Sequence, residues 1–139
     1  MKYKELSNII KKAIYSEIYE SLDDIPEENK NGDCYIQAYH YFMTNCHSNK
    51  NLRLVHGLVE GKGRLSGIRF NHAWCEDIKL KKVIDKTFPK ALQELPTIVY
   101  YSLGNVTNPH KYDLNDVTKF SIEEGTYGPW DKKLKQNEY

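Results

Sequence analysis

The spacing of apolar side chains along the first third of the chain predicts two helices. Residues 3–22 place apolar groups at intervals of three and four, which is the pattern of a helix with one buried face. Pro26 and the polar residues up to Gly32 predict a loop. Asp33 is a suitable N-cap for a second helix over roughly 34–45. The apolar face of that helix would consist of Tyr35, Ala38, Tyr39, Phe42 and Met43.

The pattern changes to short apolar runs in the middle of the chain. Residues 52–59, 68–76 and 82–85 predict three strands, the first with partial alternation of apolar and polar positions. The links between them are short, which favours an antiparallel meander. In the last third, residues 89–95 predict a short helix that Pro96 ends, and residues 113–124 predict a helix with Gly125 as its C-terminal cap.

This order of elements predicts an α+β fold in which N-terminal helices pack on an antiparallel sheet. A chain of 139 residues is long enough to bury one core, so we expect a single domain over residues 1–139. The segment 127–130 is expected to form a turn that packs an aromatic side chain on the body of the domain. Apart from this turn and the helix over residues 113–124, we recognise no known motif in residues 96–139.

Charge and targeting signals narrow the function classes. The 20 Lys and Arg residues nearly balance the 19 Asp and Glu residues, which gives no support to nucleic acid or a membrane as a partner. The Lys-rich stretch 79–82 is expected to be a solvated turn. No signal peptide and no membrane-spanning run is visible, and the three cysteines show no disulfide framework. We therefore expect free thiols and a cytoplasmic location.

Cys34 is the candidate nucleophile. It is expected just inside the N-terminus of a helix, where free N–H groups and a partial positive charge favour the thiolate and can stabilise an oxyanion. On position alone, a buried structural cysteine is the favoured interpretation, because free Cys is among the most buried residue types. His72 and Asp85 add to the functional interpretation, because they lie on neighbouring predicted strands and thiol catalysis needs a base and a group that orients it.

Counting along the predicted hairpin gives a geometric expectation for these two residues. A separation of thirteen places His72 directly opposite Asp85 if the turn is centred between Ile78 and Lys79. Trp74 and Val83 would then share the face of this pair, and the face would be covered by the helix that carries Cys34.

Other polar residues are weaker candidates. Asn31 and Asn71 are candidate oxyanion donors, although solvent-facing polar groups are the simpler interpretation of both. His56 is expected to be a core or rim histidine. A zinc set of Cys46, His47, His72 and Cys75 is disfavoured, because residues 72 and 75 of a regular strand point to opposite faces.

The segments around these residues resemble the transglutaminase-like branch of the papain-like cysteine enzymes. The matching segments are Gly32-Asp33-Cys34-Tyr35, Leu54-Val55-His56-Gly57, His72-Ala73-Trp74-Cys75-Glu76 and Val83-Ile84-Asp85-Lys86-Thr87. The resemblance covers roughly residues 31–88 and implies that Cys34 is the nucleophile, His72 the base and Asp85 the orienting acid. Lys86 stands where the family usually has proline. No acidic calcium loop is visible, so we expect no calcium, other metal or cofactor.

The resemblance implies an acyl-transfer enzyme that forms a thioester from an amide or ester. Hydrolysis, as in a peptidase, deamidase or amidase, is favoured over transfer to an amine, and a protein or peptide is the expected substrate. A second possibility is a non-catalytic binding module or inhibitor on the same fold. A third is a cell-wall amidase with a helix-start cysteine, which the Asp and the His-Ala-Trp strand disfavour.

Overall fold

The computed structural model describes residues 33–61 and 67–135. Its elements, in chain order, are α2 (Asp33–Asn45), β1 (Leu52–Glu60), β2 (Arg69–Asp77), β3 (Lys82–Ile84), the 3₁₀ helix η3 (Lys90–Leu92), β4 (Glu94–Pro96), α3 (Thr97–Gly104), β5 (Thr107–Tyr112), α4 (Leu114–Glu124) and α5 (Lys132–Lys135). The helix predicted over residues 3–22 and the candidate Asn31 lie outside the described residues.

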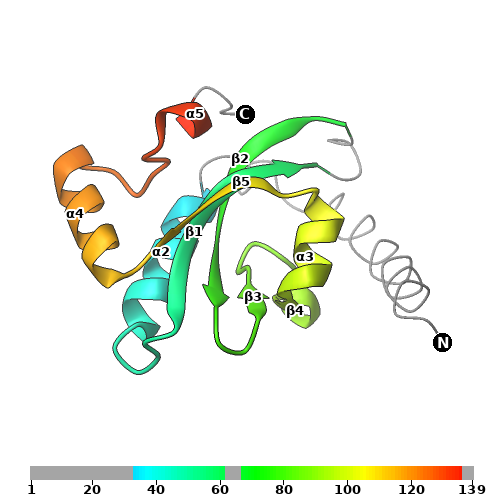
Figure 1. The fold of residues 1–139 in the computed structure, drawn as a ribbon, viewed down its shortest axis with the longest axis horizontal. Coiled ribbons are helices and arrows are strands. Elements are labelled where there is room, and N and C mark those ends of the chain that lie inside the picture. The colour runs from blue at the N-terminus through cyan, green and yellow to red at the C-terminus, as the bar shows by residue number, and fades with distance from the viewer. Residues whose placement is uncertain (1–32, 62–66, 136–139) are drawn as a thin grey trace.

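The strands form one antiparallel sheet in the order β4-β3-β2-β1-β5. Figure 1 shows α2 and α4 on one side of this sheet and α3 on the other. The described part of the chain is therefore a three-layer α+β domain, as the order of the elements predicts.

Each face of the sheet has its own apolar core. The core on the α2 side joins the buried face of that helix to β1, β2 and α4, and its members include Tyr35, Phe42, Leu54, Cys75, Val117 and Trp130. The core on the α3 side includes Val55, Trp74, Val83, Leu95, Tyr100 and Leu103. Neighbouring residues of a strand divide between the two cores, because side chains alternate between the faces of a sheet.

Helix α2 and strands β1, β2 and β3 agree with the sequence prediction to within one or two residues. Helix α4 also begins and ends as predicted: Asp113 accepts a hydrogen bond from the Asp116 backbone N–H, and Gly125 ends the helix in a left-handed conformation. Trp130 is buried, as the predicted aromatic turn requires.

Four elements were not predicted: β4, α3, β5 and α5. The helix predicted over residues 89–95 is wrong, because that stretch contains only the one-turn η3 and then joins the sheet as β4. Pro96 is the last residue of β4, and it directly precedes α3.

The register predicted for the β2–β3 hairpin is also wrong. The observed pairs are Cys75 with Ile84, Glu76 with Val83 and Asp77 with Lys82, which centres the turn one residue later than predicted. Asp77 causes the difference, because its carboxylate accepts hydrogen bonds from the backbone N–H groups of Lys79 and Leu80 and so fixes a four-residue turn. The resulting shift by two residues keeps every side chain on its predicted face.

A second correction concerns the position of α2. The helix packs on the face that carries Ala73 and Cys75, where the Cys75 thiol donates to the Ala38 carbonyl, and not on the face of His72 and Trp74. The pairing of β3 with β2 ends at Ile84. Beyond that point, no strand among the described residues pairs with this edge of β2.

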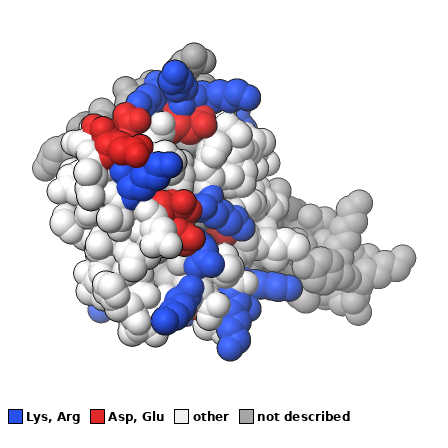
Figure 2. Space-filling model, turned by 60° about the vertical axis from the view of Figure 1, so that its left-hand side comes forward, with Lys and Arg blue, Asp and Glu red and all other residues white. Residues whose placement is uncertain are grey.

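The surface carries charges of both signs. Figure 2 shows basic and acidic side chains interspersed over the upper and central parts of one face. Several of them form ion pairs, such as Lys135 with Glu124 at 3.5 Å. Within residues 33–61 and 67–135, no helix combines the length and the apolar character that a membrane crossing needs.

Candidate active site

Cys34 lies in the first turn of α2 and is half-buried. The next residue fixes this end of the helix, because the Tyr35 hydroxyl donates to the Asn71 side chain at 2.6 Å in the core. Asp33 lies inside the first turn, where its carboxylate accepts a hydrogen bond from the Gln37 side chain, so it is not the N-cap that was expected. The first N–H groups of a helix have no acceptor within the helix, so those at the start of α2 are available to a group outside it.

His72 and Asp85 form a direct hydrogen bond. The Nε2 atom of His72 lies 2.8 Å from Oδ2 of Asp85, and the Asp85 side chain is only 1% exposed. The structure thus brings the two residues together although they are not directly opposed in the ladder. His72 keeps 13% of its side chain exposed, so one edge of the ring reaches the surface.

Three further donors hold the Asp85 carboxylate. Oδ1 accepts the Thr87 backbone N–H at 3.0 Å and the Thr87 hydroxyl at 2.6 Å. Oδ2 accepts the Tyr100 hydroxyl at 2.6 Å in addition to His72. Tyr100 comes from α3 on the far side of the sheet. Both oxygens are therefore satisfied, which is what a buried carboxylate needs to remain ionised.

The Cys34 thiol lies near the other two side chains. It is close enough to His72 to contribute to the raised pKa of the imidazole. Because Nε2 of His72 already binds Asp85, Nδ1 is the ring nitrogen that remains available to the sulfur. The structure therefore brings Cys34 at the N-terminus of α2 into the neighbourhood of the hydrogen-bonded pair of His72 and Asp85.

The electrostatics of this chain favour a charged imidazole. Burial lowers the pKa of His72, but the nearby Asp85 carboxylate and Cys34 outweigh burial and raise the pKa well above 6.5. Burial raises the pKa of Asp85, yet His72, Thr87 and Tyr100 together hold it below its ordinary value. The site therefore favours an imidazolium that is hydrogen-bonded to an ionised carboxylate.

Trp74 and Glu76 support His72 from the same face of β2. The Trp74 indole stacks on the imidazole with ring centroids 6.0 Å apart, and its N–H donates to Glu76 at 2.8 Å. Glu76 is buried and also accepts the Tyr101 hydroxyl at 2.6 Å and pairs with Lys111 at 3.1 Å. Trp74 therefore lies on the same face as His72, as expected.

Gly57 makes room for this indole. It lies opposite His72 in the β1–β2 ladder, and a Cβ atom there would meet Trp74 Cη2 at 2.9 Å. Any larger side chain would push the indole towards the imidazole on which it stacks. The glycine of the Leu54-Val55-His56-Gly57 segment thus has a steric explanation.

The remaining candidates have other roles. Asn71 is buried rather than solvent-facing; its oxygen accepts the Tyr35 hydroxyl and its nitrogen donates to the Leu134 carbonyl at 2.8 Å, so it is not an oxyanion donor. His56 is fully buried, as expected of a core histidine. Among the described residues no group of three or more His, Cys, Asp or Glu side chains could hold a metal ion.

Tyr100 and Thr87 are the site residues that the sequence analysis missed. Thr87 follows Asp85 by two positions, a spacing at which a side chain commonly binds its own backbone, so a local signal was available. Tyr100 lies fifteen residues from Asp85 on a helix that was not predicted. Only the packing of α3 on the sheet reveals it.

Comparisons with known proteins do not identify a family for this chain. No family model, no curated protein and no solved structure matches the chain. What the site can do chemically therefore follows from its own geometry: a hydrogen-bonded imidazole and carboxylate lie beside a thiol at the start of a helix.

Proposed function

We propose that the protein is a cysteine-nucleophile acyl-transfer enzyme that cleaves an amide or ester through a thioester, with hydrolysis as the main outcome. The observation that carries this proposal is the hydrogen-bonded pair of His72 and Asp85 with the Cys34 thiol beside it. The α+β fold supports a transglutaminase-like, papain-like assignment in one respect. The thiol begins a helix, and the base and its partner come from strand β2 and the end of β3.

In the first half of the reaction, the Cys34 thiolate attacks the carbonyl carbon of the substrate. The C–S bond forms while the carbonyl electron pair moves to oxygen, where N–H groups at the start of α2 can stabilise the negative charge. The tetrahedral intermediate then collapses and the C–N or C–O bond breaks. The His72 imidazolium gives its proton to the leaving amine or alcohol, and a thioester remains on Cys34.

In the second half, water attacks the thioester. The neutral imidazole of His72 takes a proton from the water, the acid product leaves, and Cys34 returns as thiolate beside the imidazolium. An amine in place of water would give transfer by the same steps. Hydrolysis is favoured because His72 is partly exposed and Cys34 is only half-buried, so water reaches both.

Asp85 keeps the imidazole in one orientation. Its hydrogen bond to Nε2 leaves Nδ1 towards the sulfur, and its charge stabilises the imidazolium of the resting state. A protein or peptide is the proposed acyl donor, because the site lies at the surface of the sheet edge and not in a closed cavity.

Thiol labelling followed by a substrate screen tests this proposal. Cys34 should react with iodoacetamide faster than Cys46 or Cys75, because those two thiols are buried and burial strongly raises the pKa of Cys75. Peptide, isopeptide and ester substrates are then screened on wild type, on Cys34→Ala and on the matched control Cys46→Ala. Turnover should vanish only in Cys34→Ala. Equal labelling of the three thiols, or an active Cys34→Ala protein, would refute the proposal and favour the binding-module alternative.

A further inference from the structure

A groove runs along the exposed face of α2 directly beside the candidate site. It has a volume of about 370 Å³ and is lined by six residues of α2, among them Ile36 and Gln37, and by Lys86. Ile36 and Gln37 follow Cys34 by two and three positions, and Lys86 directly follows Asp85. The wall formed by α2 thus begins within one helical turn of Cys34, and the wall formed by Lys86 begins directly after Asp85.

The groove offers apolar surface. Ile36 is 40% exposed, although the opposite face of the same helix is fully packed in the core. The Tyr41 ring lies further along the groove, with the Lys86 ammonium 5.0 Å from its centroid. These side chains can pack against the apolar part of a peptide, and Gln37 adds a polar group that can bind its backbone.

Lys86 is the one Lys or Arg side chain among the described residues that line the groove, and none of these residues is acidic. Lys86 is exposed and donates to the Gln93 side chain at 3.3 Å, and no described carboxylate lies within ion-pair distance of it. Lys82, four residues earlier, does pair with Glu94. The exposed ammonium of Lys86, which is not in an ion pair with a described residue, is complementary to a negative group on a ligand.

We propose that this groove is the acyl-donor subsite and that it selects peptides with an acidic side chain next to the reacting carbonyl, held by Lys86. The proposal rests on the proposed function of Cys34. An exposed ion pair is worth about 0.2–1 kcal/mol, so the preference from Lys86 alone should be about 1.5- to 5-fold. A reversal of the charge should invert that preference.

Three peptidyl chloromethyl ketones test the subsite without a known substrate. They are acetyl-Ala-Glu, acetyl-Ala-Gln and acetyl-Ala-Lys chloromethyl ketone. The thiolate of Cys34 displaces chloride from each, and a C–S bond replaces the C–Cl bond. The rate of modification, followed by intact mass, gives the ratio of the Glu probe to the Lys probe. Wild type should prefer the Glu probe, and added salt should weaken the preference.

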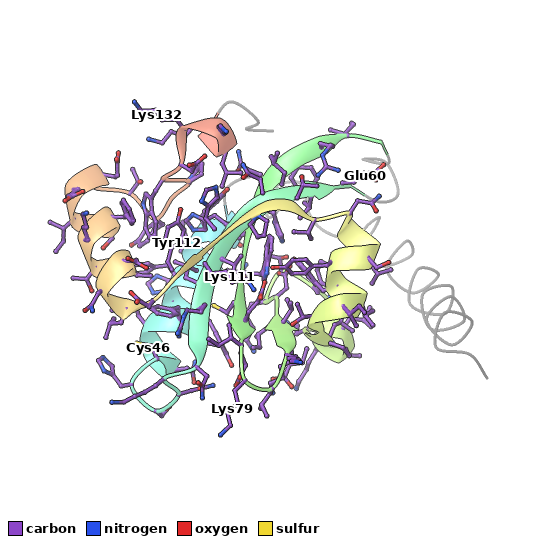
Figure 3. The ribbon with its side chains drawn as sticks, in the orientation of Figure 1. Cys46, Glu60, Lys79, Lys111, Tyr112 and Lys132 are labelled. Carbon is purple, nitrogen blue, oxygen red and sulfur yellow. The ribbon has the colours of Figure 1, made fainter. Side chains whose placement is uncertain are left out.

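The variants separate Lys86 from the other charges at the site. Lys86→Met should reduce the ratio by about 1.5- to 5-fold, and Lys86→Glu should favour the Lys probe. The His72 imidazolium also attracts an anion, but it is present in every variant, so the change in ratio reports Lys86 alone. Lys79→Met is the matched control: Lys79 lies at the tip of the β2–β3 turn and points away from the body in Figure 3. It should leave the ratio unchanged.

Each variant is also labelled with iodoacetamide, which is neutral. If wild-type Cys34 does not react faster than the other thiols, the proposed function fails and the subsite fails with it. If Cys34 reacts normally but the ratio is the same in wild type, Lys86→Met and Lys86→Glu, the subsite is refuted and the proposed function stands. If Lys79→Met changes the ratio as much as Lys86→Met does, the preference comes from the overall charge of the protein, and the subsite is also refuted.

Discussion

Replacement of His56 by leucine should remove a large part of the acid sensitivity of the protein. His56 is fully buried on β1, among the rings of Tyr35, Tyr112 and Trp130. Neither ring nitrogen has a hydrogen-bond partner among the described residues. Burial, and after it the nearby His110, lowers the pKa of His56 to about 3. The folded protein therefore holds a neutral imidazole that the unfolded chain would protonate near pH 6.5.

The sign and size of the effect follow from proton linkage. Between pH 6.5 and about 3 the unfolded state binds one more proton at this residue than the folded state, so stability is lost as the pH falls. The loss is about 1.4 kcal/mol per pH unit in that window, or about 2 kcal/mol at pH 5. Above pH 6.5 the imidazole is neutral in both states and the contribution is fully present.

Urea denaturation of wild type and His56→Leu from pH 8 to pH 4.5 measures this difference. Trp74 and Trp130 are both buried, so tryptophan fluorescence reports unfolding. At pH 8 the two proteins should differ by less than about 1.5 kcal/mol, because leucine has a similar volume. Towards pH 5 the variant should gain about 2 kcal/mol relative to wild type.

Subtraction of the two curves cancels the titrating groups that do not interact with His56, His72 included. His47→Leu, which removes an exposed imidazole from the turn after α2, is the control for loss of a histidine. Parallel curves for wild type and His56→Leu between pH 8 and 4.5 would refute the reasoning, since they would mean that His56 is protonated equally in the folded and unfolded states.

Three further predictions concern the site. Asp85→Asn should retain partial activity, because it removes the charge that orients His72 but leaves the thiol in place. A loss of activity as complete as that in Cys34→Ala would contradict an orienting role. Tyr100→Phe should lower kcat by at most about 100-fold, which corresponds to the loss of one hydrogen bond to a charged acceptor. It should also move the acid limb of the pH–rate profile to higher pH, because the ionised form of Asp85 loses a hydrogen-bond donor. An unchanged pH–rate profile would show that Tyr100 contributes only to packing. Gly57→Ala should cost about 1–3 kcal/mol of stability in denaturant melts, because its Cβ would lie 2.9 Å from Trp74; an unchanged midpoint would show that the indole moves freely.

The elements that could be predicted are those whose signals are local. Helix α4 carries its own N-cap in Asp113 and its own C-cap in Gly125, and α2 shows a clear apolar face. Strand β5 has no such signal: it contains Pro109 and exposed polar residues, and it is an edge strand joined to β1 by main-chain pairing. Helix α3 begins Thr97-Ile98-Val99, a β-branched run that favours a strand, and tertiary packing overrides that preference.

The pair of His72 and Asp85 could be predicted even though the register was wrong, and the reason lies in the sheet. A shift by two residues exchanges direct neighbours for diagonal ones without changing faces, so the two side chains stay on the same side of the sheet. Continuation of the observed ladder would place Asp85 opposite Trp74, but the pairing of β3 with β2 stops at Ile84.

The backbone of Asp85 turns instead towards Gln93, whose carbonyl accepts its N–H at 2.8 Å. Its carboxylate is then free of the ladder and is held in place by Thr87, Tyr100 and His72. The same early end of β3 opens the edge of β2, past which α2 brings Cys34 to the imidazole from the opposite face. A full-length β3 would have closed that edge, so the shortness of this strand is the structural condition for the site. Extension of the strand pairing past Ile84 should separate the thiol from His72 even with all three side chains intact.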